Sequence, residues 1–343
     1  MSRTVQFGKV ILHMKNIACA QSCRFCLSGP KKIARVPAAR FFAIVTRFLE
    51  WQEQQQEPYI PIYYTLGYAF NYDRDTVQRI CDLGKRFPRS APRRAFSLGG
   101  LPQRTDDELR RWLQMQKSFG IEAVHATIAG TESLHDFWSG RKGTFDLLTR
   151  TLRVAGELGL TRSHRLLIVR STLPCLRELC QYLDNQPPGI HDDRYAMPIY
   201  YAGFGSRLED ERITEAERDE LRSWLSAEAR GPEKWLSERE WIRQIEADEA
   251  PDRVSLHLEI NDDNVAWYES SSCEEIMESM MARTLAAYAS LPPCQELCLA
   301  YGERDGKKIY GQRDCLERKW LDLHLQSHPL SFERDLTHLA NRD

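Results

Sequence analysis

Short apolar runs alternate with longer segments of helical hydrophobic spacing over the first two-thirds of the chain. The short runs predict strands at residues 10–14, 59–66, 94–98, 121–128, 165–170 and 195–201. The longer segments predict helices at residues 37–52, 75–86, 105–120, 144–159, 176–183 and from 214 onward. Six strand–helix units in series predict an α/β fold with a parallel sheet and right-handed crossovers.

The pattern changes from about residue 207. Charged segments predict helices at 214–229 and 233–248, and alternation predicts a strand at 254–260 that turns at 261–264 and returns at 265–268. A helix at 273–289, a second hairpin around 304–307 and a helix at 313–325 follow. We therefore expect a core domain at residues 1–210 and a smaller α+β C-terminal extension at residues 211–343.

Length and composition limit the class of protein. The 343 residues can hold one barrel-sized domain and a smaller one. A formal charge of −2 gives no global field for nucleic acid, and no apolar stretch is long enough to cross a membrane. The N-terminus does not read as a secretion signal, so we expect the ten cysteines to be reduced thiols in the cytoplasm, some of them metal ligands.

Three cysteines lie close together just after the first predicted strand, in the sequence Cys19-Ala-Gln-Ser-Cys23-Arg-Phe-Cys26. A loop that follows a strand would present the three sulfur atoms to one place, with no fourth protein ligand nearby. Such an incomplete set suits an iron–sulfur cluster that leaves one iron for another ligand. The alternatives are a structural zinc site, which normally uses four ligands, and three unconnected buried thiols.

The C-x3-C-x2-C spacing resembles the signature of the radical S-adenosylmethionine (SAM) superfamily, which also favours an aromatic residue before the last cysteine, here Phe25. The resemblance implies that Cys19, Cys23 and Cys26 bind three irons of a [4Fe–4S] cluster and that the fourth iron binds SAM. One electron would cleave SAM, and the resulting 5′-deoxyadenosyl radical would abstract a hydrogen atom from the substrate. The resemblance also implies a partial (β/α)6 TIM-like barrel and an electron donor such as flavodoxin or ferredoxin.

Later loops also resemble parts of this superfamily. Ligands of such barrels gather at the C-terminal ends of the strands, where we expect SAM to meet Gly67, Gly99, Gly100, Thr127, Arg170 and Gly203, together with Phe25. Arg170 could bind the SAM carboxylate or pair with an acidic residue of a neighbouring loop. Family members often carry Gly-Gly-Glu after the second strand, where this chain reads Thr65-Leu66-Gly67-Tyr68. Another group must then hold the SAM amine.

The C-terminal third resembles the extensions of SPASM and twitch members, which carry auxiliary clusters. Cys294, Cys298 and Cys315 could bind a second cluster, or the extension could be degenerate and free of metal. Residues 126–145 resemble the fourth-strand segment of peptide-modifying and sulfatase-maturing members. We therefore expect a radical SAM enzyme that acts on a peptide or protein side chain. The alternatives are an enzyme acting on a small molecule, such as a sugar or nucleoside, and a metal-stabilised binding protein without turnover.

Overall fold

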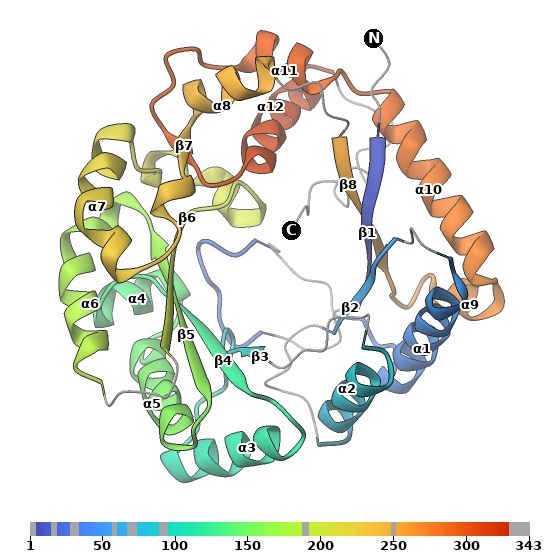
Figure 1. Cartoon of the computed structure of the whole chain (residues 1–343), viewed down its shortest axis with the longest axis horizontal. Helices are drawn as coiled ribbons and strands as arrows, with labels where there is room; N and C mark the ends of the chain where they lie inside the picture. Colours follow the sequence, from blue (N-terminus) through green and yellow to red (C-terminus); the bar gives the residue numbers. More distant parts are fainter. Residues whose placement is uncertain are drawn as a thin grey trace.

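Figure 1 shows the computed structural model of the protein, which describes residues 5–14, 19–27, 34–56, 60–66, 74–88, 95–186, 192–247 and 252–328. Two parallel sheets lie on opposite sides of the centre of the molecule, and helices cover their outer sides. The predicted α/β class with parallel strands is therefore confirmed. Among the described helices, none combines the length and apolarity that a membrane span requires.

The first sheet has the strand order β2-β1-β8. Its strands are β1 (Val5–Met14), β2 (Ile62–Leu66) and β8 (Asp252–Glu259), and both pairings are parallel. Its covering helices are α1 (Ala38–Gln54), α2 (Arg74–Arg86) and α10 (Cys273–Ala289). Residues from all six elements form one buried apolar cluster, which holds this half of the molecule together.

The second sheet has the strand order β3-β4-β5-β6, and all of its pairings are parallel. Its strands are β3 (Ala95–Ser97), β4 (Ala123–Ile128), β5 (Thr161–Ile168) and β6 (Asp192–Pro198). The helices that share its apolar cluster are α3 (Asp106–Ser118), α5 (Thr144–Glu157), α6 (Leu176–Asp184) and α7 (Glu215–Glu228). Among the described residues β2 and β3 belong to different sheets, so the TIM-like barrel stays a prediction.

The six strands predicted in the first two-thirds are confirmed as β1 to β6. The fifth strand begins at Thr161 rather than at residue 165. Arg162 and His164 are buried on this strand, which is unusual for arginine and less so for histidine. A side chain added at Gly156 of α5 would lie 3.1 Å from the Arg162 guanidinium, so this arginine packs on a helix where an apolar residue would be expected.

The remaining elements lie mostly in the C-terminal third. The helices are α4 (Glu132–Ser139), α8 (Glu238–Glu246), α9 (Val265–Ser270), α11 (Cys294–Tyr301) and α12 (Arg313–Ser327). An antiparallel pair joins β7 (Leu236–Ser237) to β9 (Ile309–Tyr310). Residues 304–307 therefore connect α11 to β9, and the hairpin predicted there is wrong because β9 pairs with a strand far away in the sequence.

The hairpin predicted at 254–268 is also wrong. Its first strand exists as β8 but pairs in parallel with β1, and residues 265–268 belong to helix α9. The Asn264 side chain accepts a hydrogen bond from the Asn261 amide (2.8 Å) and donates one to the Glu259 carbonyl (2.7 Å). These bonds end the strand and start a helix. The domain boundary at residue 210 stays a prediction, although β8 joins the C-terminal third to the N-terminal sheet.

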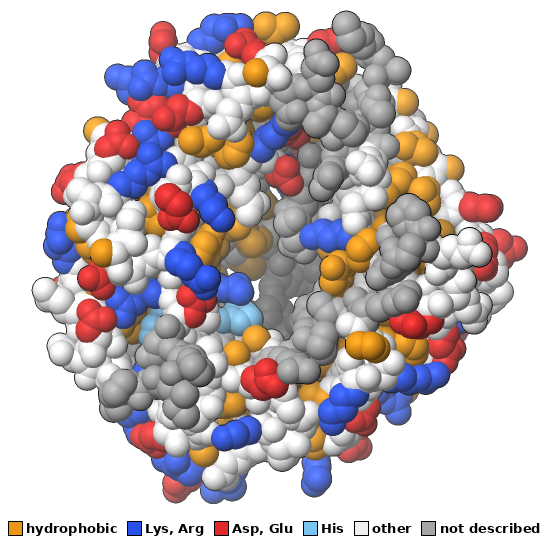
Figure 2. Space-filling view, viewed as in Figure 1, with side chains coloured by type: hydrophobic (Ala, Val, Ile, Leu, Met, Phe, Trp, Pro, Cys, Tyr) orange, Lys and Arg blue, Asp and Glu red, His pale blue; other side chains and the backbone are white. Residues whose placement is uncertain are grey.

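Each parallel sheet has one packed face and one face turned toward the centre. In β4, Val124, Ala126 and Ile128 lie in the apolar cluster with the helices, whereas His125 and Thr127 are half-buried. Alternation of side chains along a strand explains this difference. Figure 2 shows a hollow between the two halves of the molecule, with basic and histidine side chains at its border. The inner face of β4, with His125 and Thr127, is therefore more polar and more open than the face that packs on the helices.

Candidate functional site

The cysteine loop (residues 19–27) runs along the C-terminal end of α4. The Ser22 amide donates to the Ser139 carbonyl (3.2 Å), and the Arg24 amide donates to the Trp138 carbonyl (2.9 Å). Gly140 ends α4 in the left-handed conformation (φ 68°). A β-carbon at this glycine would lie 2.4 Å from the Ser22 carbonyl oxygen. Glycine is therefore required both for the helix end and for the close approach of the loop.

Two arginine side chains fasten the loop further. The Arg24 guanidinium donates to the Phe137 carbonyl (3.0 Å) and lies 4.1 Å from the centre of the Phe137 ring. Arg141 donates to the Ala20 carbonyl (3.2 Å) and to the Leu101 carbonyl (2.8 Å). Arg141 thereby joins the loop to the turn after β3, since each guanidinium nitrogen serves a different segment.

The other side of the loop meets the turns that follow β3 and β6. The Phe204 amide donates to the Cys26 carbonyl (2.9 Å). Gly203 has a φ of 53°, and a β-carbon there would lie 2.4 Å from the carbonyl oxygens of Cys26 and Leu27. The Gly100 amide donates to the Gln21 side chain (2.9 Å). Two of the glycines predicted to bind SAM thus contact the cysteine loop itself.

Phe25 anchors the loop through apolar contact. It packs against a buried cluster at the ends of three strands, whose members are Ala129, Trp138, Leu167, Val169 and Ile199. Trp138 belongs to α4, and the other four residues follow or end β4, β5 and β6, so the loop sits over the C-terminal ends of the second sheet. This position agrees with the rule that ligands of parallel α/β folds bind at that end of the strands.

The three thiols of the loop share a partly open environment. Cys19, Cys23 and Cys26 are half-buried and form no disulfide, and the Cys23 sulfur lies 3.5 Å from the Gln21 side-chain oxygen. The donor set fits an iron–sulfur cluster because three soft sulfur ligands stand on one loop whose backbone is fixed by its neighbours. Within the described ranges, however, no three His, Cys, Asp or Glu side chains are gathered into a metal-binding group. The ligand role of the triad stays a prediction.

The other predicted SAM-binding residues have different surroundings. Arg170 donates to Glu217 (3.1 Å) and to the Arg212 carbonyl (3.3 Å), so it forms the ion pair that was the alternative to a SAM contact. Thr127 is half-buried on the inner face of β4. The Gly99 amide lies 3.5 Å from the Ser97 hydroxyl. Gly67 falls outside the described residues.

Helix α4, which the sequence did not reveal, supports the loop through a buried histidine. The Ala129 amide at the end of β4 donates to His135 Nδ1 (3.1 Å). Burial lowers the pKa of His135 to about 4, so the ring is neutral near pH 7 and acts as a structural acceptor. The neighbouring Asp136 accepts from the amides of Gly143 (2.5 Å) and Phe145 (2.9 Å) at the start of α5. In the sequence, the pair His135-Asp136 was the available signal for this helix, because both side chains can accept hydrogen bonds from backbone amides nearby in the chain.

The second set of cysteines lies in a closed environment. Cys294 and Cys298 of α11 and Cys315 of α12 are buried in one apolar cluster. Burial raises the pKa of all three thiols, and Glu317, which accepts from Cys294 (3.1 Å), raises that of Cys294 further. A raised pKa opposes formation of the thiolate that binds metal. These contacts favour a packing role, and the second cluster is a prediction with no support among the described residues.

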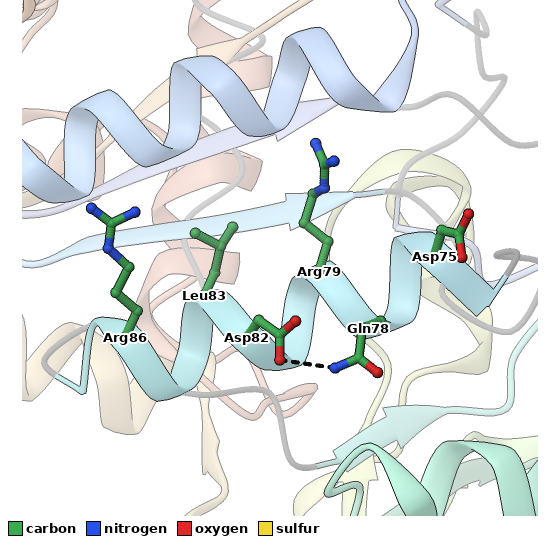
Figure 3. Close-up of a pocket in the computed structure, with 6 residues that line it drawn as sticks. All are labelled: Asp75, Gln78, Arg79, Asp82, Leu83 and Arg86. Carbon is green, nitrogen blue, oxygen red and sulfur yellow. Dashed lines mark hydrogen bonds between the residues drawn. The ribbon is translucent and has the colours of Figure 1, made fainter.

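A shallow groove on the first half of the molecule carries no comparable chemistry. Figure 3 shows it along α2, lined by Asp75, Gln78, Arg79, Asp82, Leu83 and Arg86. Gln78 donates to Asp82 (2.8 Å), and Arg86 pairs with Glu50 of α1 (2.6 Å). A hydrogen bond and an ion pair of this kind are typical of a solvated helix face.

No protein-family model and no curated protein matches the chain. The solved structures similar to it include coproporphyrinogen III oxidase (HemN) from Escherichia coli, described as a radical SAM enzyme, at 9% identity over 93% of this chain and 89% of that one, with a TM-score of 0.45. Methylornithine synthase (PylB) shares 11% identity over 64% of this chain and 63% of its own, with a TM-score of 0.41. SuiB of Streptococcus suis, solved with S-adenosylmethionine bound, shares 9% identity over 64% and 44%, with a TM-score of 0.40. We base the proposed function on the chain's own residues, because similarities this weak assign no family.

Proposed function

We propose that this protein is a radical SAM enzyme that binds its cluster through Cys19, Cys23 and Cys26. The observation that carries the proposal is the position of the C-x3-C-x2-C loop, with three half-buried thiols, over the C-terminal ends of a parallel sheet. A structural zinc site fits this position less well, because it would need a fourth protein ligand and a closed shell. A metal site that binds a substrate directly needs an open coordination position instead.

The residues around the loop would hold the triad ready for the cluster. When bound, a [4Fe–4S] cluster supplies the electron that cleaves SAM, and the 5′-deoxyadenosyl radical so formed takes a hydrogen atom from the substrate. The hydrogen bonds from Ser22 and Arg24 to α4, and from Phe204 to Cys26, fix the backbone between the thiols. Phe25 shields one side of the loop from water through its apolar cluster. Fixed geometry and exclusion of water are what the protein contributes to such chemistry.

We propose a peptide or protein side chain as the substrate, supported by the resemblance of residues 126–145 to peptide-modifying members. A small molecule, such as a sugar or nucleoside, is the second candidate. It is supported by β8, which pairs with β1 and so extends the first sheet beside the inner space. In either case a flavodoxin or ferredoxin is the expected electron donor, and we propose a cytoplasmic location.

Anaerobic reconstitution with iron and sulfide tests the proposal. We expect about four irons per chain and formation of 5′-deoxyadenosine when SAM and a strong reductant are added. Cys81→Ala, which changes a half-buried thiol of α2, serves as the matched control and should keep both properties. Uptake of zinc without iron and sulfide, or an iron-loaded protein that leaves SAM intact, would contradict the proposed function.

A further inference from the structure

Arg165 lies on the face of β5 that is turned away from the helices. Its neighbours Leu166 and Ile168 are buried in the apolar cluster of the second sheet, so alternation turns Arg165 and Leu167 toward the opposite face. Leu167 belongs to the small cluster on which Phe25 of the cysteine loop packs. Two residues of a strand span about 7 Å. The Arg165 backbone therefore lies about 7 Å along β5 from Leu167, and both side chains are on the same face of the sheet.

Two residues with hydroxyl groups flank Arg165. The register of the sheet pairs it with Thr127 of β4 and with Tyr195 of β6. Paired residues on neighbouring parallel strands lie about 5 Å apart with their side chains on one face. Arg165 is exposed, and Tyr195 is 38% exposed. Arg165 therefore lies on an accessible face of the sheet, between the hydroxyl groups of Thr127 and Tyr195.

The charge of Arg165 has no ion-pair partner in the part of the chain that the structure describes. Among the described residues no hydrogen bond or ion pair engages its guanidinium. Asp193, two residues before Tyr195 on β6, lies close enough to influence it electrostatically, but its carboxylate is paired with Arg230. A guanidinium is always charged in proteins, so within the described ranges this positive charge is left without an ion pair.

The surroundings of Arg165 are those of a group that lines a hollow. Burial lowers the pKa of Arg165, while nearby Tyr200, Tyr195 and Asp193 act in the opposite direction. The side chain is nevertheless exposed to solvent. Protein atoms on several sides together with access for water describe the wall of a concave space, and Figure 2 shows such a hollow with basic side chains at its border.

Two other arginines on or just beyond the second sheet are already paired with carboxylates. Arg194 of β6 pairs with Asp184 (2.7 Å), and Arg170 beyond the end of β5 pairs with Glu217 (3.1 Å). Arg165 differs from both, because no described residue occupies its planar donor groups, which could therefore bind an external partner. Guanidinium binds carboxylate and phosphate with two parallel hydrogen bonds.

We propose that Arg165, assisted by Tyr195, binds an anionic group of the substrate, a carboxylate or a phosphate, in the hollow beside the cysteine loop. The substrate assignment rests on the proposed function, whereas the anion site itself does not. SAM also carries a carboxylate, so the experiment must separate the two sources. An anionic group held here would bring the rest of a bound molecule toward the loop that carries the three thiols.

The test is chemical modification of arginine by phenylglyoxal on the reconstituted protein, followed site by site with mass spectrometry. We expect inorganic phosphate and acetate to slow modification of Arg165 by about tenfold when either anion is at about ten times its dissociation constant, because only the free fraction reacts. Arg170 is the matched control and should be modified at an unchanged rate, since Glu217 already occupies it. Equal rates for Arg165 with and without both anions would overturn the proposal.

Two further measurements in the same experiment test whether the bound anion comes from the substrate or from SAM, and whether Tyr195 contributes. SAM added alone should leave the modification rate of Arg165 unchanged, and protection by SAM would overturn the substrate assignment in favour of the cofactor's carboxylate. Tyr195→Phe should raise the phosphate concentration for half-protection by about threefold, as expected for one hydrogen bond; no change would remove Tyr195 from the site. If no cluster assembles, the proposed function fails, while protection by phosphate and acetate would still establish the anion site.

Discussion

The two sets of cysteines have the same spacing at their start but opposite surroundings. Cys19 and Cys23 are four residues apart, as are Cys294 and Cys298. The first pair stands half-buried on a loop at the ends of strands, and the second lies inside an apolar cluster on α11. The comparison teaches that spacing alone does not distinguish a ligand set from core residues. What distinguishes them is whether the thiolate is accessible and whether a ligand could reach it.

The largest expected effect separates the two sets directly. Cys23→Ala should abolish cluster assembly, because a cluster held by three thiolates has no spare protein ligand. Cys298→Ala should keep the full iron content, because its thiol is buried in the apolar cluster. Iron and sulfide analysis after anaerobic reconstitution measures both. Iron retained in Cys23→Ala, or lost in Cys298→Ala, would reverse the roles given to the two sets.

A smaller effect tests how the loop is held. Gly203→Ala would place a β-carbon 2.4 Å from the carbonyl oxygens of Cys26 and Leu27 at a φ of 53°. We expect partial loss of iron and a decrease of about 2 kcal/mol in the free energy of unfolding. Gly120→Ala is the control, since Gly120 also has a positive φ (105°) but no atom near its β-carbon position. Denaturant unfolding and iron analysis follow both variants, and equal iron contents would mean that Gly203 does not position the loop.

The pH dependence of stability tests the support that α4 gives to the loop. Burial lowers the pKa of His135 to about 4, below its ordinary value of about 6.5. The unfolded chain therefore binds a proton on this histidine at a pH where the folded chain does not. The stability it contributes is complete above pH 6.5 and decreases as the pH falls toward 4.

Between pH 7 and pH 5 we expect a loss of about 2 kcal/mol in the free energy of unfolding from this group. His135→Gln should remove that part of the pH dependence while keeping an acceptor for the Ala129 amide. Urea unfolding at the two pH values measures the difference. A variant with the same pH slope as the unchanged protein would show that His135 is not the group responsible.

The smallest effect is a difference in reactivity. Raised pKa values leave little thiolate on Cys294, Cys298 and Cys315 near neutral pH, and burial blocks the reagent. We expect iodoacetamide at pH 8 to alkylate them at least about tenfold more slowly than Cys19 and Cys26 in the cluster-free protein. Mass spectrometry of timed digests gives the rates. Comparable rates would mean that the second set is open to ligands after all.

Local patterns predicted much of the fold. The six apolar runs correspond to β1 to β6, and the helix predicted at residues 105–120 is present as α3, which begins with a capping box between Thr105 and Glu108. The position of β8 beside β1 could not be read from the sequence, because pairing between residues so far apart depends on packing of the whole core. Helix α4 is short, and contacts such as that of His135 with Ala129 support it.

The candidate site was predicted in part for the same reason. The triad and its place after β1 follow from spacing and periodicity alone. The segments that hold the loop, through Ser139 and Phe204, come from distant parts of the chain and leave no local signal. The open guanidinium of Arg165 is likewise defined by what its neighbours do, since Arg230 has already neutralised Asp193. Accessible charge is a property of the assembled sheet.

Mössbauer spectroscopy of the protein reconstituted with ⁵⁷Fe tests the central claim most directly. Three thiolates leave one iron of a [4Fe–4S] cluster without a protein ligand, so that iron alone can bind SAM. We predict the spectrum of a [4Fe–4S] cluster in which addition of SAM changes the signal of about one quarter of the iron. A spectrum without cluster iron, or a cluster whose spectrum SAM leaves unchanged, would contradict the role given to Cys19, Cys23 and Cys26.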